Sequence, residues 1–184
     1  QGLAVLRGLV ERSLLQRAEA SERDAAAWFE MHPLVQALAA EHLAADHASW
    51  QAARQRHADH VRRALLRLAA RPPAERRAML DGVRMRLPDV RAAWRWSLDS
   101  VQPAFVAQCA SVLADFFEHH GRWDEGITMF SDAQACLDAS RPAELAALAA
   151  ATGACARMHF RRGDATTAEA LALQALAWNR QLRH

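Results

Sequence analysis

The chain has 184 residues, a formal net charge of +2 and an apolar fraction of 52%, with only 7 Gly and 6 Pro. Its alanine-rich composition favours close-packed helices, and the absence of Tyr with few β-branched residues argues against a large sheet. Acidic and basic residues are interspersed, so the charge neither requires nor excludes nucleic-acid binding. The sequence contains no run of 18 apolar residues, so no membrane span is predicted.

Three cysteines stand far apart in expected helices, without a C-x-x-C pair. An odd number of cysteines in such positions favours buried thiols in a reducing cytoplasm. The sequence has no signal-peptide pattern, so secretion is not expected. The chain lacks an initiator Met and opens on an apolar pattern, which indicates a segment of a longer protein.

The N-terminal part predicts a helix, a β-hairpin and a second helix. Apolar residues at i, i+3, i+7 spacing place the first helix over 3–10. Segments 13–17 and 26–31 have strand-like content and flank a charged stretch, so we expect a hairpin that Trp28 anchors. Pro33 then opens a helix, because proline is tolerated at the first helical position. This order is that of the second half of a winged-helix domain.

Three further helices are expected before the last part of the chain. Helical spacing predicts a long one over 50–68, after which two prolines break the chain and begin a short helix. Gly82 is interpreted as the C-terminal end of that short helix. The third helix covers 90–98 and contains Trp94 and Trp96, which should face different sides, so one of the two is expected in the core.

The last part of the chain repeats itself. A helix ends before Gly121 and another follows, and the same order recurs around Gly163, an offset of 163 − 121 = 42 residues. Tetratricopeptide repeats have a period of about 34, and 42 lies within the spread of helical-repeat arrays. The second hairpin is the weaker match and is expected to stand mid-array, with further repeats beyond residue 184. The alignment pairs Ala114 with Gly126 and Ala156 with Ala168, and assigns the space between hairpins to Trp123, Phe130, Ala165 and Ala172.

Five stretches in this order resemble one protein family. LRGLVERSLLQ and WFEMHPLVQALAAEHLA, with Met31, His32 and Glu41 in place, resemble the winged-helix segment of STAND-class ATPases, including LuxR-type and related bacterial regulators. RQRHADHVRRALLRL resembles the family's linker helix, LPDVRAAWRWSL the segment after it, and GRWDEGITMF the first repeat turn. The resemblance covers nearly the whole chain, with departures at Gln36, Leu38, Pro88 and Val90.

The resemblance implies a regulatory role. In such proteins the winged helix packs on the upstream ATPase domain and locks it, and the repeats sense a small-molecule inducer or a partner protein that releases the lock. The family's phosphate-binding loop is absent here, since none of the glycines belongs to G-x-x-x-x-G-K-[ST]. We therefore expect no ATP binding by that route and predict no cofactor.

Catalytic and metal sites are weakly supported by the residues. His57 and His60 at i, i+3 have no third ligand at a recognisable spacing, and H-E-x-x-H is missing, so no metal is predicted. The adjacent pair 119–120 is interpreted as two histidines that point apart at a helix end. Asp115 and Glu118 are read as a solvated helix face rather than an acid–base pair, and no nucleophile lies in a G-x-S-x-G turn. The chain is therefore predicted not to be an enzyme.

The remaining candidate is the groove formed by the first helices of the two hairpins. Acidic residues on one hairpin and basic residues on the next could recognise a polar peptide or an effector. The alternative is that two repeats are too few for a complete site. The predicted groove residues are Gln108, Ser111, Asp115, Glu118, His119, Arg157, Phe160 and Arg161.

The predicted fold class is mainly all-α, with tetratricopeptide-like helical hairpins preceded by a partial winged helix with one β-hairpin. The expected parts are a winged-helix segment over 1–46, a helical linker bundle over 47–100 and two hairpins over 101–184. The first hypothesis for function is a non-catalytic, cytoplasmic sensing and protein-interaction segment. Direct DNA binding through the winged helix is the second hypothesis. It is disfavoured because Arg7 is the one basic residue of the expected recognition helix. The third is effector binding in the groove, and no membrane partner is expected.

Overall fold

A computed structural model of the chain describes residues 2–17 and 29–183. Within them the protein is mainly helical, with one two-stranded antiparallel sheet, which confirms the predicted fold class. The chain divides into two compact units, Gln1–Ala53 (unit 1) and Arg54–His184 (unit 2), which are described separately. Unit 2 contains the residues expected to form the two hairpins and the expected linker bundle except residues 47–53, which belong to unit 1.

Unit 1 contains the expected helix, hairpin and helix. Helix α1 spans Gly2–Glu11, strands β1 and β2 span Leu15–Arg17 and Phe29–Met31, and helix α2 spans Pro33–Ala45. The strands pair antiparallel, and their middle residues face each other in register. The expected hairpin loop and Trp28 lie outside the described residues.

Local chemistry explains where α2 begins. Pro33 occupies the first helical position, where a backbone N–H would have no acceptor within the helix, so the missing N–H of proline costs no hydrogen bond. His32 caps the helix, because its Nδ1 accepts a hydrogen bond from the backbone N–H of Leu34 at 3.2 Å. The helix has no buried residue, and Leu34 is 75% exposed.

The first half of unit 2 is built from α3 to α5. Helix α3 spans His47–Ala69 and crosses the division between the units, a short 3-10 turn spans Pro73–Glu75, and α4 and α5 span Arg76–Met85 and Leu87–Asp99. Their apolar faces are buried together with the later helices. The core side chains from this half include Val61, Leu65, Leu68, Met79, Leu80, Val83, Leu87, Val90, Trp94, Trp96 and Leu98.

Two predictions in this region are wrong. Gly82 does not end α4 but lies inside it, because a Cβ there would come 2.8 Å from Leu68 Cδ2 and the glycine serves close packing. Both tryptophans of α5 are core residues rather than one, with Trp94 3% and Trp96 6% exposed. Helix α5 packs against both α6 and α7, and the ring of Trp94 meets Phe105 of α6 and Phe130 of α7 edge to face.

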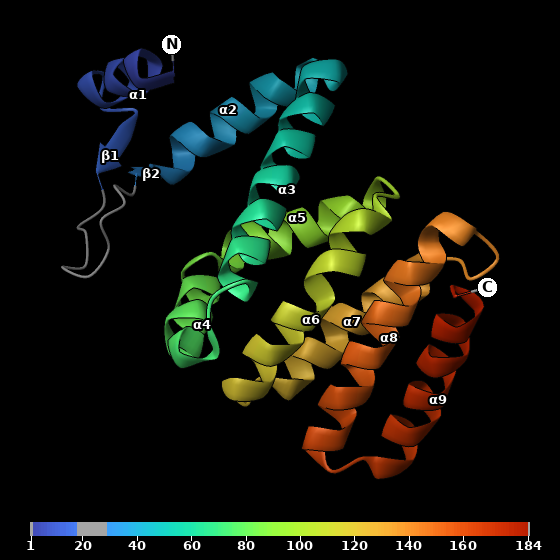
Figure 1. Ribbon diagram of the computed structural model, residues 1–184. Helices are drawn as coiled ribbons and strands as arrows, with labels where there is room; N and C mark the ends of the chain where they lie inside the picture. The colour runs from blue at the N-terminus through green and yellow to red at the C-terminus, as the bar shows by residue number, and fades with distance from the viewer. Residues whose placement is uncertain (1, 18–28, 184) are drawn as a thin grey trace. The chain divides into compact units, whose positions relative to one another are not determined.

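The second half of unit 2 is two helical hairpins. Helices α6 and α7 span Pro103–His119 and Trp123–Cys136, and helices α8 and α9 span Pro142–Arg162 and Ala165–Gln181. Helix α8 is the central element, because it packs against α6, α7 and α9 (Figure 1).

The two hairpin turns have the same backbone structure. Gly121 and Gly163 both have positive φ, +64° and +93°, a region that glycine enters at little cost. The N–H of each glycine donates to the carbonyl three residues before it, and the N–H of the next residue donates to the carbonyl five residues before it. Each of these bonds recurs at an offset of 42 residues, so the structure supports the alignment of the two hairpins.

The side chains between the helices differ from the predicted pairing. The atoms nearest to a Cβ at Gly126 belong to Met158 of α8 and Phe117 of α6, rather than to Ala114. The ring of Phe130 lies 5.8 Å from Trp94 and 6.1 Å from Phe117, so it packs toward α5 and α6. Gly126 is therefore the point where α8 approaches the first hairpin closely.

Candidate interaction groove

A pocket of unit 2 lies along α8 and α9. It has a volume of about 710 Å³, and we call it the α8–α9 groove. Half of the residues that line it are glycine or alanine, and Phe160, which is 64% exposed, is its largest apolar side chain. The lining residues are Glu118, Gly153, Ala156, Arg157, Phe160, Arg161, Ala165, Ala168, Glu169 and Ala172.

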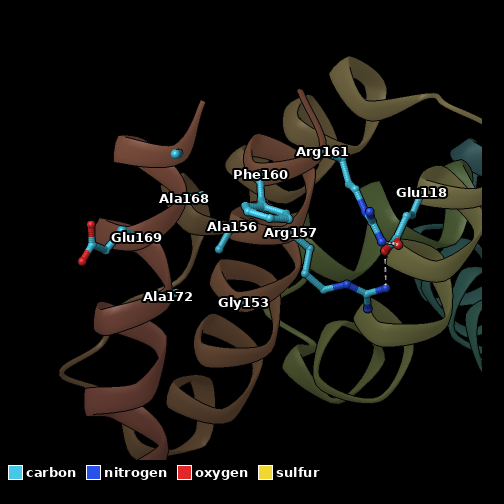
Figure 2. Close-up of a pocket in the computed structure, with 10 residues that line it drawn as sticks. Glu118, Gly153, Ala156, Arg157, Phe160, Arg161, Ala168, Glu169 and Ala172 are labelled. Carbon is cyan, nitrogen blue, oxygen red and sulfur yellow. Dashed lines mark hydrogen bonds and ion pairs between the residues drawn. The ribbon is translucent and has the colours of Figure 1, made fainter. Parts of the chain in front are cut away.

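An ion-pair cluster closes the α6 side of the groove. Arg157 of α8 donates to Asp115 at 2.7 Å and to Glu118 at 2.6 Å, and Arg161 also pairs with Glu118. Figure 2 shows both arginines reaching toward Glu118, while Glu169 on α9 points away from them. Arg76 of α4 lies 3.9 Å from Asp115. The acids and bases therefore bind each other across α6 and α8.

The pairing changes the proton affinity of the cluster. Hydrogen bonds from Arg157 and Arg161 lower the pKa of Glu118, against a partial burial that would raise it. Burial alone would lower the pKa of Arg157, but its bonds to Asp115 and Glu118 outweigh that effect and raise it. Both groups are thus held in their charged forms at neutral pH.

The structure brings together half of the predicted groove residues. Glu118, Arg157, Phe160 and Arg161 line the α8–α9 groove, and Asp115 contacts it through Arg157. Gln108 instead accepts a hydrogen bond from Arg62 of α3 at 2.8 Å, and the exposed Ser111 and His119 do not line the pocket. Asp115 and Glu118 are also not a solvated face, because each is bound by arginine.

Sequence reasoning missed the wall that α9 provides. Ala165, Ala168, Glu169 and Ala172 line the groove, yet the prediction was restricted to the first helices of the hairpins. The signal was present, since the repeat alignment already placed Ala168 against Ala156. Small residues on facing helices leave space between them, and an exposed ring at Phe160 makes that space apolar.

A second pocket of about 450 Å³ lies between α5 and α7. Its floor includes Trp94, whose Nε1 donates to the carbonyl of Met129 at 3.2 Å. At its rim Glu125 is bound by Arg91, whose Nε lies 3.0 Å away, and by Arg122. The negative charge of Glu125 is therefore paired with arginines of the chain itself.

The structure also places the histidines that the sequence offered as metal ligands and as a helix-end pair. His57 Nε2 lies 3.4 Å from Asp89 Oδ1 rather than beside a ligand set, and residues 2–17 and 29–183 contain no metal-type cluster. His119 and His120 do not point apart as predicted, since their rings meet edge to face at 5.2 Å. The second ring also lies 4.7 Å from that of Phe116, so packing on α6 turns it back toward its neighbour.

The prediction of buried thiols holds for two cysteines and is wrong for Cys136, which is exposed at the end of α7. Burial raises the pKa of Cys109 to about 12 and also raises that of Cys155. Neither buried thiol is therefore a reactive thiolate. No helix among the described residues is long and apolar enough to cross a membrane.

In comparisons with known proteins, no protein-family model, no curated protein and no solved structure matched the chain.

Proposed function

We propose that this chain is a non-catalytic, cytoplasmic protein-interaction segment that binds its partner in the α8–α9 groove. We further propose, from the sequence resemblance, that it belongs to a STAND-type signalling ATPase or transcriptional regulator, where it would transmit partner binding to the upstream ATPase domain.

The observation that carries the proposal is the groove itself. Its wall combines alanines and an exposed phenylalanine ring with arginine side chains at one edge. Exposed aromatic and arginine side chains are enriched at protein interfaces, where they contribute much of the binding energy. Arg157 and Arg161 are already held by Glu118, so they are ordered before a partner arrives and lose little side-chain entropy on binding.

The proposal is tested by partner capture with matched variants. The chain is expressed with a proximity label in cells that naturally produce it, beside Phe160→Asp and Met85→Asp. Met85 is a 51% exposed apolar residue on α4, away from the groove. A partner captured by the native chain and by Met85→Asp, but lost with Phe160→Asp, supports the proposal. Equal capture by all three chains, or capture of no partner, refutes it.

A second candidate function is the binding of a small effector in the same groove. Its volume of about 710 Å³ falls within the usual range of about 300–1,000 Å³ for ligand sites. A thermal-shift screen against a metabolite panel tests this function. Stabilisation of the native chain that is lost with Phe160→Asp would favour the effector.

DNA binding has less support. Arg7 is the one basic residue on the expected recognition helix. Its Nε donates to Glu11 at 2.7 Å, so its charge is paired within α1. A gel-shift titration tests this function at about 50 mM salt, where even non-specific phosphate binding is strong. A shifted band would support DNA binding.

A further inference from the structure

Positive charge is concentrated in one segment of unit 2. Between residues 54 and 77 the sequence has eight arginines and two acidic residues, a net charge of +6. The whole chain has a net charge of +2, so its other residues together carry −4. Most of the basic segment belongs to α3, and the structure shows which of its side chains face the solvent.

Three arginines and a histidine form a line along the exposed side of α3. Arg56, His60, Arg63 and Arg67 follow one another at intervals of four, three and four residues, and all four are exposed. Side chains at these intervals lie one above another on the same face of a helix. We call these four residues the α3 basic stripe. A different face of α3 is apolar and buried, and it consists of Ala58, Val61, Ala64, Leu65 and Leu68.

The arginines of the stripe are not paired within the fold. The side chains of Arg56, Arg63 and Arg67 make no ion pair and no hydrogen bond with residues 2–17 or 29–183. The neighbouring Arg62 lies on another side of the helix and donates to Gln108 at 2.8 Å and to Asp59 at 3.2 Å. Asp59 is the one acidic residue of α3, so that helix offers the stripe no further carboxylate.

The stripe matches an anion that is repeated at short, regular intervals. An α-helix rises about 1.5 Å per residue, so successive stripe residues stand about 4.5–6 Å apart along α3, and the stripe is about 16 Å long. One strand of a nucleic-acid duplex carries a phosphate about every 3.4 Å along its axis. Several phosphates of one strand therefore come within reach of the three arginine side chains.

Two other polyanionic partners fit the stripe less well. A helix that binds an anionic membrane surface needs an open apolar face beside its basic face, whereas the apolar face of α3 is buried and Leu66, its exposed large hydrophobic residue, is only 36% exposed. An acidic protein would form exposed ion pairs, which contribute about 0–1 kcal/mol each. A phosphate backbone also releases condensed counterions on binding, so the same three arginines gain more there.

We propose that the α3 basic stripe binds the phosphodiester backbone of nucleic acid. Contacts of this kind position a protein on the backbone and carry no sequence information. The inference goes beyond the proposed function, which concerns the α8–α9 groove. It also differs from DNA recognition by the winged helix, because it uses α3 and not α1. Duplex and single-stranded nucleic acids share this chemistry, and the experiment distinguishes them.

The salt dependence of binding is the main measurement. Labelled oligonucleotides of mixed sequence, one duplex and one single strand, are titrated with the 184-residue chain at pH 7.5, and fluorescence anisotropy follows the binding from about 20 to about 150 mM salt. Three arginine–phosphate contacts should give a slope of log K against log salt of about −2.7 for the duplex or about −2.1 for the single strand. No binding at about 20 mM salt, as expected if another part of the chain covers the stripe, or binding that does not depend on salt, overturns the proposal.

Two triple variants with the same change in net charge locate the contact. The stripe variant, Arg56→Gln with Arg63→Gln and Arg67→Gln, should bind at least about tenfold more weakly at about 20 mM salt and show a slope near zero. The control variant should change binding by less than about threefold and keep the slope. It replaces three exposed arginines outside the stripe, Arg95→Gln, Arg180→Gln and Arg183→Gln. Equal losses in the two variants would show that net charge and not the stripe controls binding, and would overturn the proposal.

A charge-conserving variant separates charge from folding. Lysine at positions 56, 63 and 67 keeps three positive charges on flexible stems, so binding should stay within about threefold of the native chain and the slope should be unchanged. A loss as large as that of the stripe variant would mean that the glutamines act by disturbing α3, and the proposal would fall.

Three further measurements test the alternative contacts. Loss of oligonucleotide binding with Arg7→Gln, as large as with the stripe variant, would assign the contact to α1. Binding to vesicles with about 30% phosphatidylserine, without binding to oligonucleotides, would show a membrane surface as the partner. Displacement of the oligonucleotide by polyglutamate at equal concentration of charge would show that an acidic protein fits as well. Each of these results overturns the proposal and leaves the proposed function standing, since that function is tested at Phe160.

Discussion

Replacing one glycine in each hairpin with alanine should change stability in opposite directions. Gly126→Ala in α7 places a Cβ 2.9 Å from Cγ and Sδ of Met158 and 3.2 Å from Cδ2 of Phe117. Gly153→Ala in α8 places it 3.9 Å from the Cβ of Ala175, an ordinary contact distance. The two substitutions are chemically identical and both lie inside helices, so their difference isolates packing.

The magnitudes follow from two opposing effects. Alanine is about 1 kcal/mol more favourable than glycine in a helix interior, and overfilling a packed core costs about 1–3 kcal/mol. Because Met158 and Phe117 are fully buried and cannot move into solvent, the packing cost should exceed the gain at Gly126. With a packing cost in the middle of that range, about 2 kcal/mol, we expect Gly126→Ala to lower the free energy of unfolding by about 1 kcal/mol. Gly153→Ala should raise it by about 0.5–1 kcal/mol.

Urea unfolding followed by circular dichroism at 222 nm measures both effects as shifts of the midpoint at constant slope. Adding Met158→Ala to Gly126→Ala should relieve the overlap, so the two changes should be less destabilising together than their sum by about 1 kcal/mol. If Gly126→Ala stabilised the protein as Gly153→Ala does, the close approach of α8 to α7 at Gly126 would be wrong.

Three further predictions concern unit 2. Arg157→Met should destabilise the protein by about 1 kcal/mol at neutral pH. Because the folded pKa of Glu118 is lowered, this difference should be present above its unfolded pKa and be lost as the pH falls below about 4; a difference that is independent of pH in urea unfolding contradicts it. Cys136 should react with a thiol reagent in the folded chain while the two buried cysteines react only after unfolding, and three equal rates would contradict their burial. Gly163→Ala and Gly121→Ala should each cost about 1–2 kcal/mol, since their positive φ strains an L-residue; unchanged unfolding midpoints would contradict this.

Local signals in the sequence predicted the helices and the turns between them well. Gly121 and Gly163 were recognisable because a tight turn between helices commonly needs a residue that accepts positive φ. Gly82 has the same identity but a different cause. It faces Leu68 from another helix, and a contact between residues 14 apart in sequence leaves no mark on the local pattern.

The candidate site was only half predictable for a related reason. The repeat alignment placed Asp115 and Glu118 on the inner face of the first hairpin, and Arg157 and Arg161 on that of the second. It did not show that these two faces lie against each other. The acidic and basic side chains were therefore expected to bind a polar peptide or an effector. In the structure α8 lies directly on α6, and the charges satisfy one another. The open surface moves to α9, where no charge pattern indicated it.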